Sequence, residues 1–166
     1  MRSKRTPLPA ARKVASLAAL ARIVRRLSAQ GRRVVFTNGC FDLLHAGHVK
    51  LLERAKRLGD VLIVGINSDR SVRGLKGPGR PIVPQGDRAL VLASLASVDY
   101  VTVFNDATPL QVITRLEPHV LVKGADWGAT EIVGRELLRR HSGRIVRVPL
   151  LAGHSTSNLI ARIRNA

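Results

Sequence analysis

Cysteine, aromatic residues and acidic residues are all scarce in this 166-residue sequence. Its single cysteine, Cys40, excludes an intrachain disulfide, so a reducing cytosol is the expected compartment. No stretch reaches the roughly 18 uninterrupted apolar residues of a membrane span. Arginines also interrupt residues 14–27, which excludes the apolar segment of a signal peptide. An apolar content of 45% nevertheless allows one substantial core.

Lysine and arginine outnumber the acids by 28 to 11, and their distribution decides what this excess means. Residues 1–33 contain ten of the cations and no acid, so the rest of the chain carries 18 cations and 11 acids. Only five scattered aromatics are present, which argues against a basic nucleic-acid-binding module with a base-stacking platform. An arginine-rich terminus is typical of a solvated tail. Contact with RNA, an anionic membrane surface or a partner stays the alternative.

The apolar pattern predicts an α/β fold. Residues 1–12, with two prolines and few apolar side chains, are expected to form a basic flexible leader. A single domain is expected over 13–166, beginning with an amphipathic helix at 14–30. Strand-like runs then alternate with helical ones, which predicts a Rossmann-like, doubly wound sheet of five parallel strands with helices on both faces. The predicted strands are 33–37, 61–67, 100–104, 119–123 and 144–148, and the predicted helices 48–58, 87–96, 109–116, 130–141 and 155–164.

The glycine turn within residues 37–48 is the most informative part of the sequence. An apolar run typical of a buried strand leads into it, and His45 and His48 then open a helical pattern. A strand-to-helix turn directs backbone N–H groups and the positive end of the helix dipole at one point, which stabilises an anion. The two histidines share one side of the first helical turn, so both can donate to phosphate oxygens. The turn therefore predicts a phosphate site.

Two further segments suit phosphates. Residues 73–81 are too rich in glycine and proline for a helix or strand, which predicts a mobile loop whose basic side chains form a lid. Residues 155–157 are three consecutive hydroxyl side chains ahead of an apolar helical pattern. They either cap that helix or bind phosphate at its positive end.

Together these motifs resemble the cytidylyltransferase-like nucleotidyltransferases. The signature of that family is a strand, a glycine turn with Phe-Asp, and His-x-Gly-His. The resemblance covers residues 34 to 163. Its further segments occur in the family's order: Val64-Gly65-Ile66-Asn67-Ser68-Asp69, Leu75-Lys76-Gly77 with Arg80-Pro81, Asp87-Arg88, Val98-Asp99-Tyr100, Leu121-Val122-Lys123-Gly124-Ala125-Asp126-Trp127 and Gly153-His154-Ser155-Thr156-Ser157-Asn158-Leu159-Ile160.

The resemblance implies a role for individual residues. Catalysis is expected from His45, His48 and Lys123. The acceptor substrate is expected to contact Asp42, Asn67, Asp69 and Arg80. Nucleotide contacts are expected from the turn, the lid and the ends of two later elements: Asn38, Gly39, Cys40, Phe41, Gly47, Lys76, Arg88, Gly124, Ser155, Thr156 and Ser157. Mg²⁺ is expected as a cofactor that arrives with ATP, without an assigned protein ligand.

Several of these residues have a structural alternative. Asp42 is also typical of a helix cap, Arg88 of a surface position on a helix, and Lys123 of a solvated strand end. Taken alone, residues 155–157 favour capping, whereas beside the full family pattern they favour phosphate binding. His154 departs from the residue usual in the most similar branch of the family, and it is assigned no role.

That branch adenylylates heptose 1-phosphate, which implies ATP and a sugar 1-phosphate as substrates and ADP-heptose and pyrophosphate as products. A cytidylyltransferase that makes a CDP-alcohol such as CDP-glycerol is the alternative within the family. The glycerol-3-phosphate branch places an arginine shortly before the hydroxyl motif, and residues 149–153 contain none. A sugar kinase is expected as a separate chain, because no such domain fits into 166 residues. The oligomeric state stays open, with a homodimer as one option.

Overall fold

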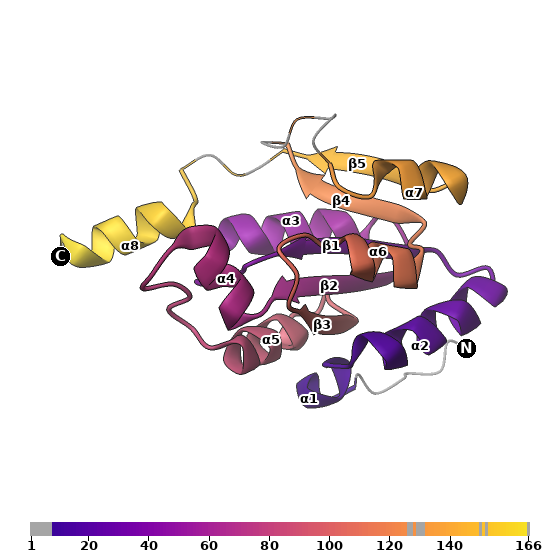
Figure 1. Ribbon diagram of the computed structural model, residues 1–166, viewed down its shortest axis with the longest axis horizontal. Coiled ribbons are helices and arrows are strands. Elements are labelled where there is room, and N and C mark those ends of the chain that lie inside the picture. The colour runs from indigo at the N-terminus through magenta and orange to yellow at the C-terminus, as the bar shows by residue number, and fades with distance from the viewer. Residues whose placement is uncertain (1–7, 126–127, 129–131, 150, 152, 166) are drawn as a thin grey trace.

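The computed structural model describes residues 8–125, 128, 132–149, 151 and 153–165. Five strands form one sheet in which every pair of neighbours is parallel, in the order β3-β2-β1-β4-β5 (Figure 1). The prediction of a five-stranded parallel sheet is therefore confirmed. The strands are β1 (Val34–Gly39), β2 (Val61–Asn67), β3 (Tyr100–Phe104), β4 (Val120–Gly124) and β5 (Arg144–Val148).

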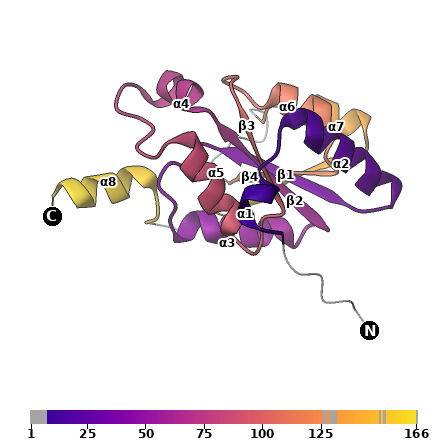
Figure 2. The ribbon, with the colours of Figure 1, turned by 90° about the horizontal axis from the view of Figure 1, so that it is seen from below.

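Helices cover both faces of this sheet, as the doubly wound prediction requires (Figure 2). One face is packed by α1 (Ala10–Lys13), α3 (Ala46–Lys56) and α5 (Gln85–Ser94). The other face is packed by α2 (Leu17–Ala29), α6 (Leu110–Leu116) and α7 (Arg135–Arg140). Two further helices, α4 (Asp69–Lys76) and α8 (Thr156–Arg164), lie toward the end of the molecule to which the strands point (Figure 1).

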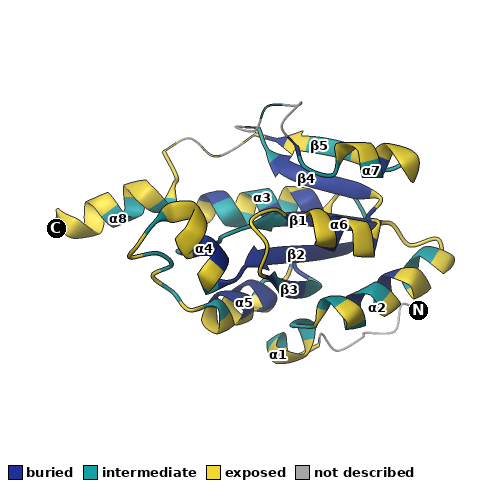
Figure 3. Cartoon of the chain, viewed as in Figure 1, coloured by how far each residue is buried: buried dark blue, intermediate teal, exposed yellow. Residues whose placement is uncertain are grey.

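The centre of the sheet is buried because helices cover both of its faces. Every residue of β2 is buried, and β1 is buried over its first four residues (Figure 3). Runs of valine, leucine and isoleucine are typical of such strands, since both faces must be apolar. No helix among the described residues is long and apolar enough to cross a membrane.

The strand order creates one crevice. Strand β1 lies at the centre of the sheet. The chain first adds β2 and β3 on one side of β1, and then crosses over to add β4 and β5 on its other side. Ligands of open α/β sheets bind at the carboxyl ends of the strands where the order reverses. In this sheet that point lies between the ends of β1 and β4.

The N-terminal segment differs from its prediction. Residues 10–12 belong to α1 rather than to a flexible leader, and the Lys13 ammonium fixes this helix by donating to the carbonyls of Leu95 and Val98. The predicted helix at 14–30 begins later, at Leu17, because the Ser16 hydroxyl caps it. Residues 1–7 lie outside the described part of the chain.

The prediction of an irregular loop over 73–81 is wrong for its first half. Helix α4 continues to Lys76 and ends at Gly77, which has a φ of 88°. The Ser68 hydroxyl caps the helix, and Val72, a residue of the helix itself, is fully buried. These contacts outweigh the cost of Gly74 inside a helix, which is about 1 kcal/mol. Helix α7 is also shorter than the predicted 130–141, of which residues 130 and 131 are not described.

Candidate active site

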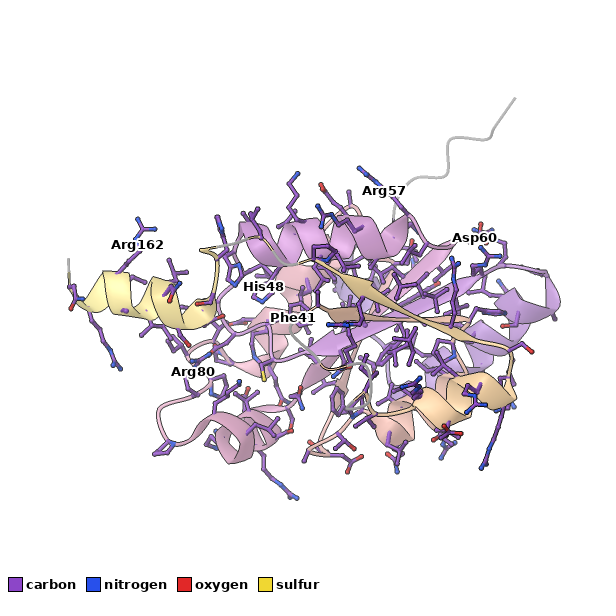
Figure 4. The ribbon with its side chains drawn as sticks, turned by 90° about the horizontal axis from the view of Figure 1, so that it is seen from above. Phe41, His48, Arg57, Asp60, Arg80 and Arg162 are labelled. Atoms are coloured by element: carbon purple, nitrogen blue, oxygen red, sulfur yellow. The ribbon has the colours of Figure 1, made fainter. Side chains whose placement is uncertain are left out.

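The turn after β1 is shaped by close packing between Gly39 and Phe41. A Cβ on Gly39 would lie 3.1 Å from Phe41 Cε2, so any larger residue here would force the phenyl ring to shift by a few tenths of an ångström. Phe41 itself has a φ of 47°, in the left-handed region that is costly for a bulky residue. Its ring centroid lies 5.0 Å from that of His48 (Figure 4). The turn is thus a constrained element that fixes one wall beside a histidine.

The two predicted catalytic histidines lie against each other. His45 is the N-cap residue of α3 but supplies no capping hydrogen bond, and its ring stacks on His48 with 3.8 Å between the centroids. Gly47 makes this possible, because a Cβ there would lie 3.0 Å from Cε1 and Nδ1 of His45. The glycine of His-x-Gly-His therefore provides the space in which the His45 ring lies over the start of the helix.

Both imidazoles are held in the uncharged form. Burial and then the neighbouring His45 lower the pKa of His48 to about 4. Burial and then His154 also lower the pKa of His45. Among the described residues, the buried Nδ1 atoms of both rings have no hydrogen-bond partner. A buried N–H without an acceptor is costly, so each neutral ring is best protonated on Nε2. The pair can therefore donate two hydrogen bonds to an incoming anion at the start of α3.

Lys123 and Asn38 meet across the crevice between β1 and β4. The Lys123 ammonium donates to Asn38 Oδ1 over 2.6 Å, and the lysine is only 6% exposed. The alternative of a solvated strand end is therefore wrong for Lys123. A buried cation at the point where the strand order reverses suits a phosphate oxygen. Gly124 follows it directly and is half-buried.

Asp42 anchors the segment that was predicted as a lid. Its side chain is 0% exposed, and its carboxylate accepts from Arg80 Nε at 2.5 Å and from the Ile82 and Val83 amides at 2.8 and 2.9 Å. Burial opposes ionisation, but the amides of Val83 and Ile82 and the Arg80 guanidinium outweigh it and lower the pKa of Asp42. The helix-cap alternative for Asp42 is wrong, since α3 receives no side-chain cap. Asp42 and Arg80 therefore come together as an ion pair.

Arg88 lies inside the protein, so its interpretation as a surface residue is wrong. The guanidinium is 0% exposed and donates to the carbonyls of Val83, Cys40 and Asn67 and to the Asp69 carboxylate. One side chain thereby joins the ends of β1 and β2 to the start of α4 and to Val83, which follows the predicted lid. Its spacing could have indicated this, because Arg88 and the buried Leu92 are four residues apart on one helix face.

The other residues predicted around the nucleotide and acceptor occupy the same end of the sheet. The buried Asn67 donates from Nδ2 to the Ser71 hydroxyl, and Asp69 pairs with Arg88. Lys76 is exposed at the end of α4. Burial raises the pKa of the Cys40 thiol against the opposing effect of Lys76, Arg88 and Arg80. Cys40 is therefore a neutral thiol close to three cations, and the predicted contact from this position is its backbone amide.

The hydroxyl motif is carried by α8, which contacts the rest of the protein little. The Ser155 hydroxyl accepts from the Asn158 amide at 3.0 Å, so its capping role is confirmed. Thr156 is half-buried, Ser157 is exposed, and no residue of α8 is buried (Figure 3). Figure 1 shows the helix directed away from the sheet. Phosphate binding by these hydroxyl groups stays a prediction.

His154 joins the site although the sequence assigned it no role. Its ring centroid lies 6.4 Å from that of His45, and a Cβ on Gly47 would lie 3.2 Å from His154 Cβ. The available signal was its place directly before the hydroxyl motif. Asp126 and Trp127, which were part of the sequence resemblance, lie outside the described residues.

In the part of the chain that the structure describes, the expected Mg²⁺ meets no group of side chains that could hold it alone. Within the described ranges, no three histidine, cysteine, aspartate or glutamate side chains are grouped so that they could hold a metal ion. The Asp42 carboxylate is occupied by Arg80 and two amides. Mg²⁺ retains waters and binds readily to substrate phosphates. The residues present thus fit an ion that is bound mainly by a triphosphate.

Comparison with known proteins agrees with this geometry. The model of the Cytidylyltransferase-like family matches residues 36–160. The chain is 51% identical over 154 residues to the bifunctional protein HldE of Geobacter sulfurreducens, covering 93% of this chain and 31% of that protein. It is 52% identical over 151 residues to HldE of Magnetococcus marinus, covering 91% and 31%. The chain thus spans less than a third of the length of these curated relatives.

Two solved structures share the fold at low identity. A lipopolysaccharide core biosynthesis protein from Thermoplasma volcanium matches with a TM-score of 0.59 and 24% identity, over 73% of this chain and 98% of that one. The pantoate-beta-alanine ligase of Francisella tularensis matches with a TM-score of 0.60 and 17% identity, over 92% and 79%. At these identities the likeness concerns the fold alone.

Proposed function

This chain belongs to the cytidylyltransferase-like family and is a nucleotidyltransferase, and we propose that it transfers AMP from ATP to heptose 1-phosphate. The products are ADP-heptose and pyrophosphate. The observation that carries this proposal is the pair of neutral, stacked imidazoles at the uncapped start of α3. The choice of acceptor is supported by about half of the residues being identical to HldE proteins from several bacteria.

The proposed reaction needs little proton transfer. An oxygen of the already ionised sugar phosphate forms a new bond to the α-phosphorus of ATP. The bond from the α-phosphorus to the oxygen that bridges to the β-phosphorus breaks, and pyrophosphate leaves with that electron pair. Charge therefore grows on the α-phosphate oxygens and on the leaving group, where donors in fixed positions stabilise the transition state.

Different residues of the site stabilise different parts of the two substrates. Nε2–H groups of His45 and His48 donate to the phosphate at which the bonds change. Lys123, already fixed by Asn38, contributes a buried positive charge at the β1–β4 crevice. Arg80 reaches the acceptor phosphate from its ion pair with Asp42. Asn38, Gly39, Phe41, Gly47 and Gly124 keep the backbone of the turn and the end of β4 close to the nucleotide. Mg²⁺, carried on the triphosphate, neutralises part of its charge.

Arg88 is proposed as a positioning residue rather than a direct nucleotide contact. Its guanidinium holds the carbonyls of Cys40 and Asn67, so it fixes the turn that presents the histidines and the end of β2 that leads to Asp69. The acceptor contacts assigned to Asn67 and Asp69 follow from the same arrangement. We further propose that a sugar kinase acts in the route to heptose 1-phosphate and that the reaction takes place in the cytosol with ATP.

A pyrophosphate-release assay tests the proposal. ATP and CTP are each combined with heptose 1-phosphate and with glycerol 3-phosphate, with and without Mg²⁺. We expect turnover with ATP and heptose 1-phosphate, dependence on Mg²⁺, and none with glycerol 3-phosphate. An unpaired polar base edge in a closed pocket costs about 1–3 kcal/mol, so kcat/KM for ATP should exceed that for CTP by at least about tenfold. Preferential formation of CDP-glycerol would overturn the substrate assignment and leave the phosphate site intact.

A further inference from the structure

A third imidazole approaches the catalytic pair from a different part of the chain. His154 precedes α8, and its amide donates to the Leu151 carbonyl over 3.3 Å, so the backbone turns at this point. The His154 ring lies 6.4 Å from His45, whose ring in turn stacks on His48. Gly47 lies between the two segments, because an added Cβ would crowd both His45 and His154 Cβ. Three imidazoles from two segments therefore surround the start of α3.

We propose that His154 is a third phosphate-binding side chain, and that this three-histidine cluster takes up a proton when the triphosphate binds. The inference rests on the proposed function in one respect, because the anion is taken to be the triphosphate of ATP. It extends that function by coupling nucleotide affinity to pH. It also assigns phosphate binding to His154, a role that depends on the place of this residue beside His45.

The charges around the cluster support proton uptake. Before ligand arrives, burial lowers the pKa of both His48 and His45, and the neighbouring His154 lowers the pKa of His45 further. The first turn of α8 after His154, residues 156–159, has no ionisable side chain. Elsewhere on α3, Lys50 pairs with Glu53 at 3.6 Å and Arg54 donates to the Pro149 carbonyl at 2.9 Å. From the lid segment, Arg80 is paired with Asp42.

A polyanion reverses the balance between the neutral and charged forms. Three close imidazoles repel a shared proton in the free protein, whereas a triphosphate beside them favours the protonated form of whichever ring contacts it. The bound state then holds more protons than the free state. By linkage, ATP affinity rises as the pH falls from 8 to 6 and decreases as the pH rises. His154 is the exposed member of the three, so an incoming phosphate can reach its ring.

Calorimetric titration of the whole chain with Mg²⁺-ATP tests this inference. Titration in two buffers that differ in ionisation enthalpy gives the number of protons taken up, for wild type and for His154→Gln. The ligand's own ionisation is common to both proteins, so the difference belongs to the cluster. We expect His154→Gln to take up roughly half a proton fewer at pH 7, and to bind about tenfold more weakly than wild type at pH 6 with a smaller difference at pH 8.

Two further variants separate charge from structure. His154→Lys carries a permanent cation, so its affinity should stay high at pH 8 and vary less with pH than that of wild type. His141→Gln removes a histidine that pairs with Glu117, away from the three-histidine cluster, and should leave proton uptake unchanged. Equal proton uptake and equal pH dependence in wild type and His154→Gln would overturn the inference. ATP binding with proton uptake but without adenylyl transfer would instead overturn the proposed function alone.

Discussion

The two parts of the candidate phosphate site are built in opposite ways. The turn between β1 and α3 is packed tightly: Asp42 is 3% exposed, Phe41 is 6% exposed, and Gly39 and Gly47 leave space for neighbouring rings. Helix α8 carries the hydroxyl motif without one buried residue. In Figure 4, His48 and Phe41 lie within the body of the protein, whereas Arg162 lies on the helix that extends beyond it.

From this contrast we expect the packed turn to hold the catalytic groups in place and the exposed helix α8 to contribute to nucleotide binding. Donors that stabilise a transition state are effective when their positions are fixed before the reaction, and the histidine pair meets that condition. The hydroxyl motif lies on a helix without a buried residue, so its position relative to the histidine pair is fixed less firmly. We therefore expect changes in the turn to affect kcat or folding strongly, and changes in α8 to act mainly through nucleotide affinity.

Arg88→Met should produce the largest effect, because it removes the side chain that ties the turn to three other segments. The variant leaves the carbonyls of Cys40, Asn67 and Val83 without this donor and Asp69 without its ion pair. Asp69 stays 28% exposed, so the main loss is the donor to the three carbonyls, and leaving a buried acceptor unpaired costs about 1–3 kcal/mol. Chemical denaturation should show a decrease of this size.

Arg115→Met is the matched control for that experiment. This arginine is exposed on α6, and its replacement should change the free energy of unfolding by less than about 0.5 kcal/mol. Equal stability of the two variants would mean that the Arg88 contacts do not hold the site together.

His48→Ala should lower kcat by roughly two to three orders of magnitude, because the ring contributes mainly in the transition state. Nucleotide affinity, measured by calorimetry, should change far less. Steady-state kinetics with ATP and heptose 1-phosphate provide the comparison. Turnover close to wild type would remove the histidine pair from the mechanism.

Ser155→Ala should have the smallest effect. The variant loses the hydrogen bond that the Ser155 cap accepts from the Asn158 amide, which costs about 1 kcal/mol of helix stability. Because α8 buries no residue, the loss should increase amide exchange within residues 156–164 and leave the unfolding midpoint of the body unchanged. Hydrogen exchange followed by mass spectrometry measures both regions in one experiment. A lower midpoint for the whole protein would show that α8 is coupled to the core.

Features that depend on local pattern could be predicted from the sequence. Short segments rich in valine, isoleucine and leucine indicated all five strands. The glycine turn placed His45 and His48 at a helix start because the strand and the helix are adjacent in sequence. Features that depend on distant partners could not. Helix α1 is held by carbonyls of Leu95 and Val98, more than 80 residues away.

The corrected residues follow the same rule. By its charge alone, Arg88 is typical of a helix surface and Asp42 of a helix cap, and the structure contradicts both alternatives. Their partners are mainly backbone groups of the turn and the lid segment, whose approach is set by the packing of α5 against the sheet. His154 also required tertiary structure, since its distance from His45 does not follow from a separation of more than 100 residues.

The bond that forms in the reaction is the most direct test of the central claim. Heptose 1-phosphate labelled with ¹⁸O in all of its phosphate oxygens is incubated with ATP, Mg²⁺ and the protein, and the products are analysed by mass spectrometry. If the sugar phosphate attacks the α-phosphorus, all of the label appears in ADP-heptose and the pyrophosphate is unlabelled. Label in the pyrophosphate, or release of AMP without ADP-heptose, would contradict adenylyl transfer at this site.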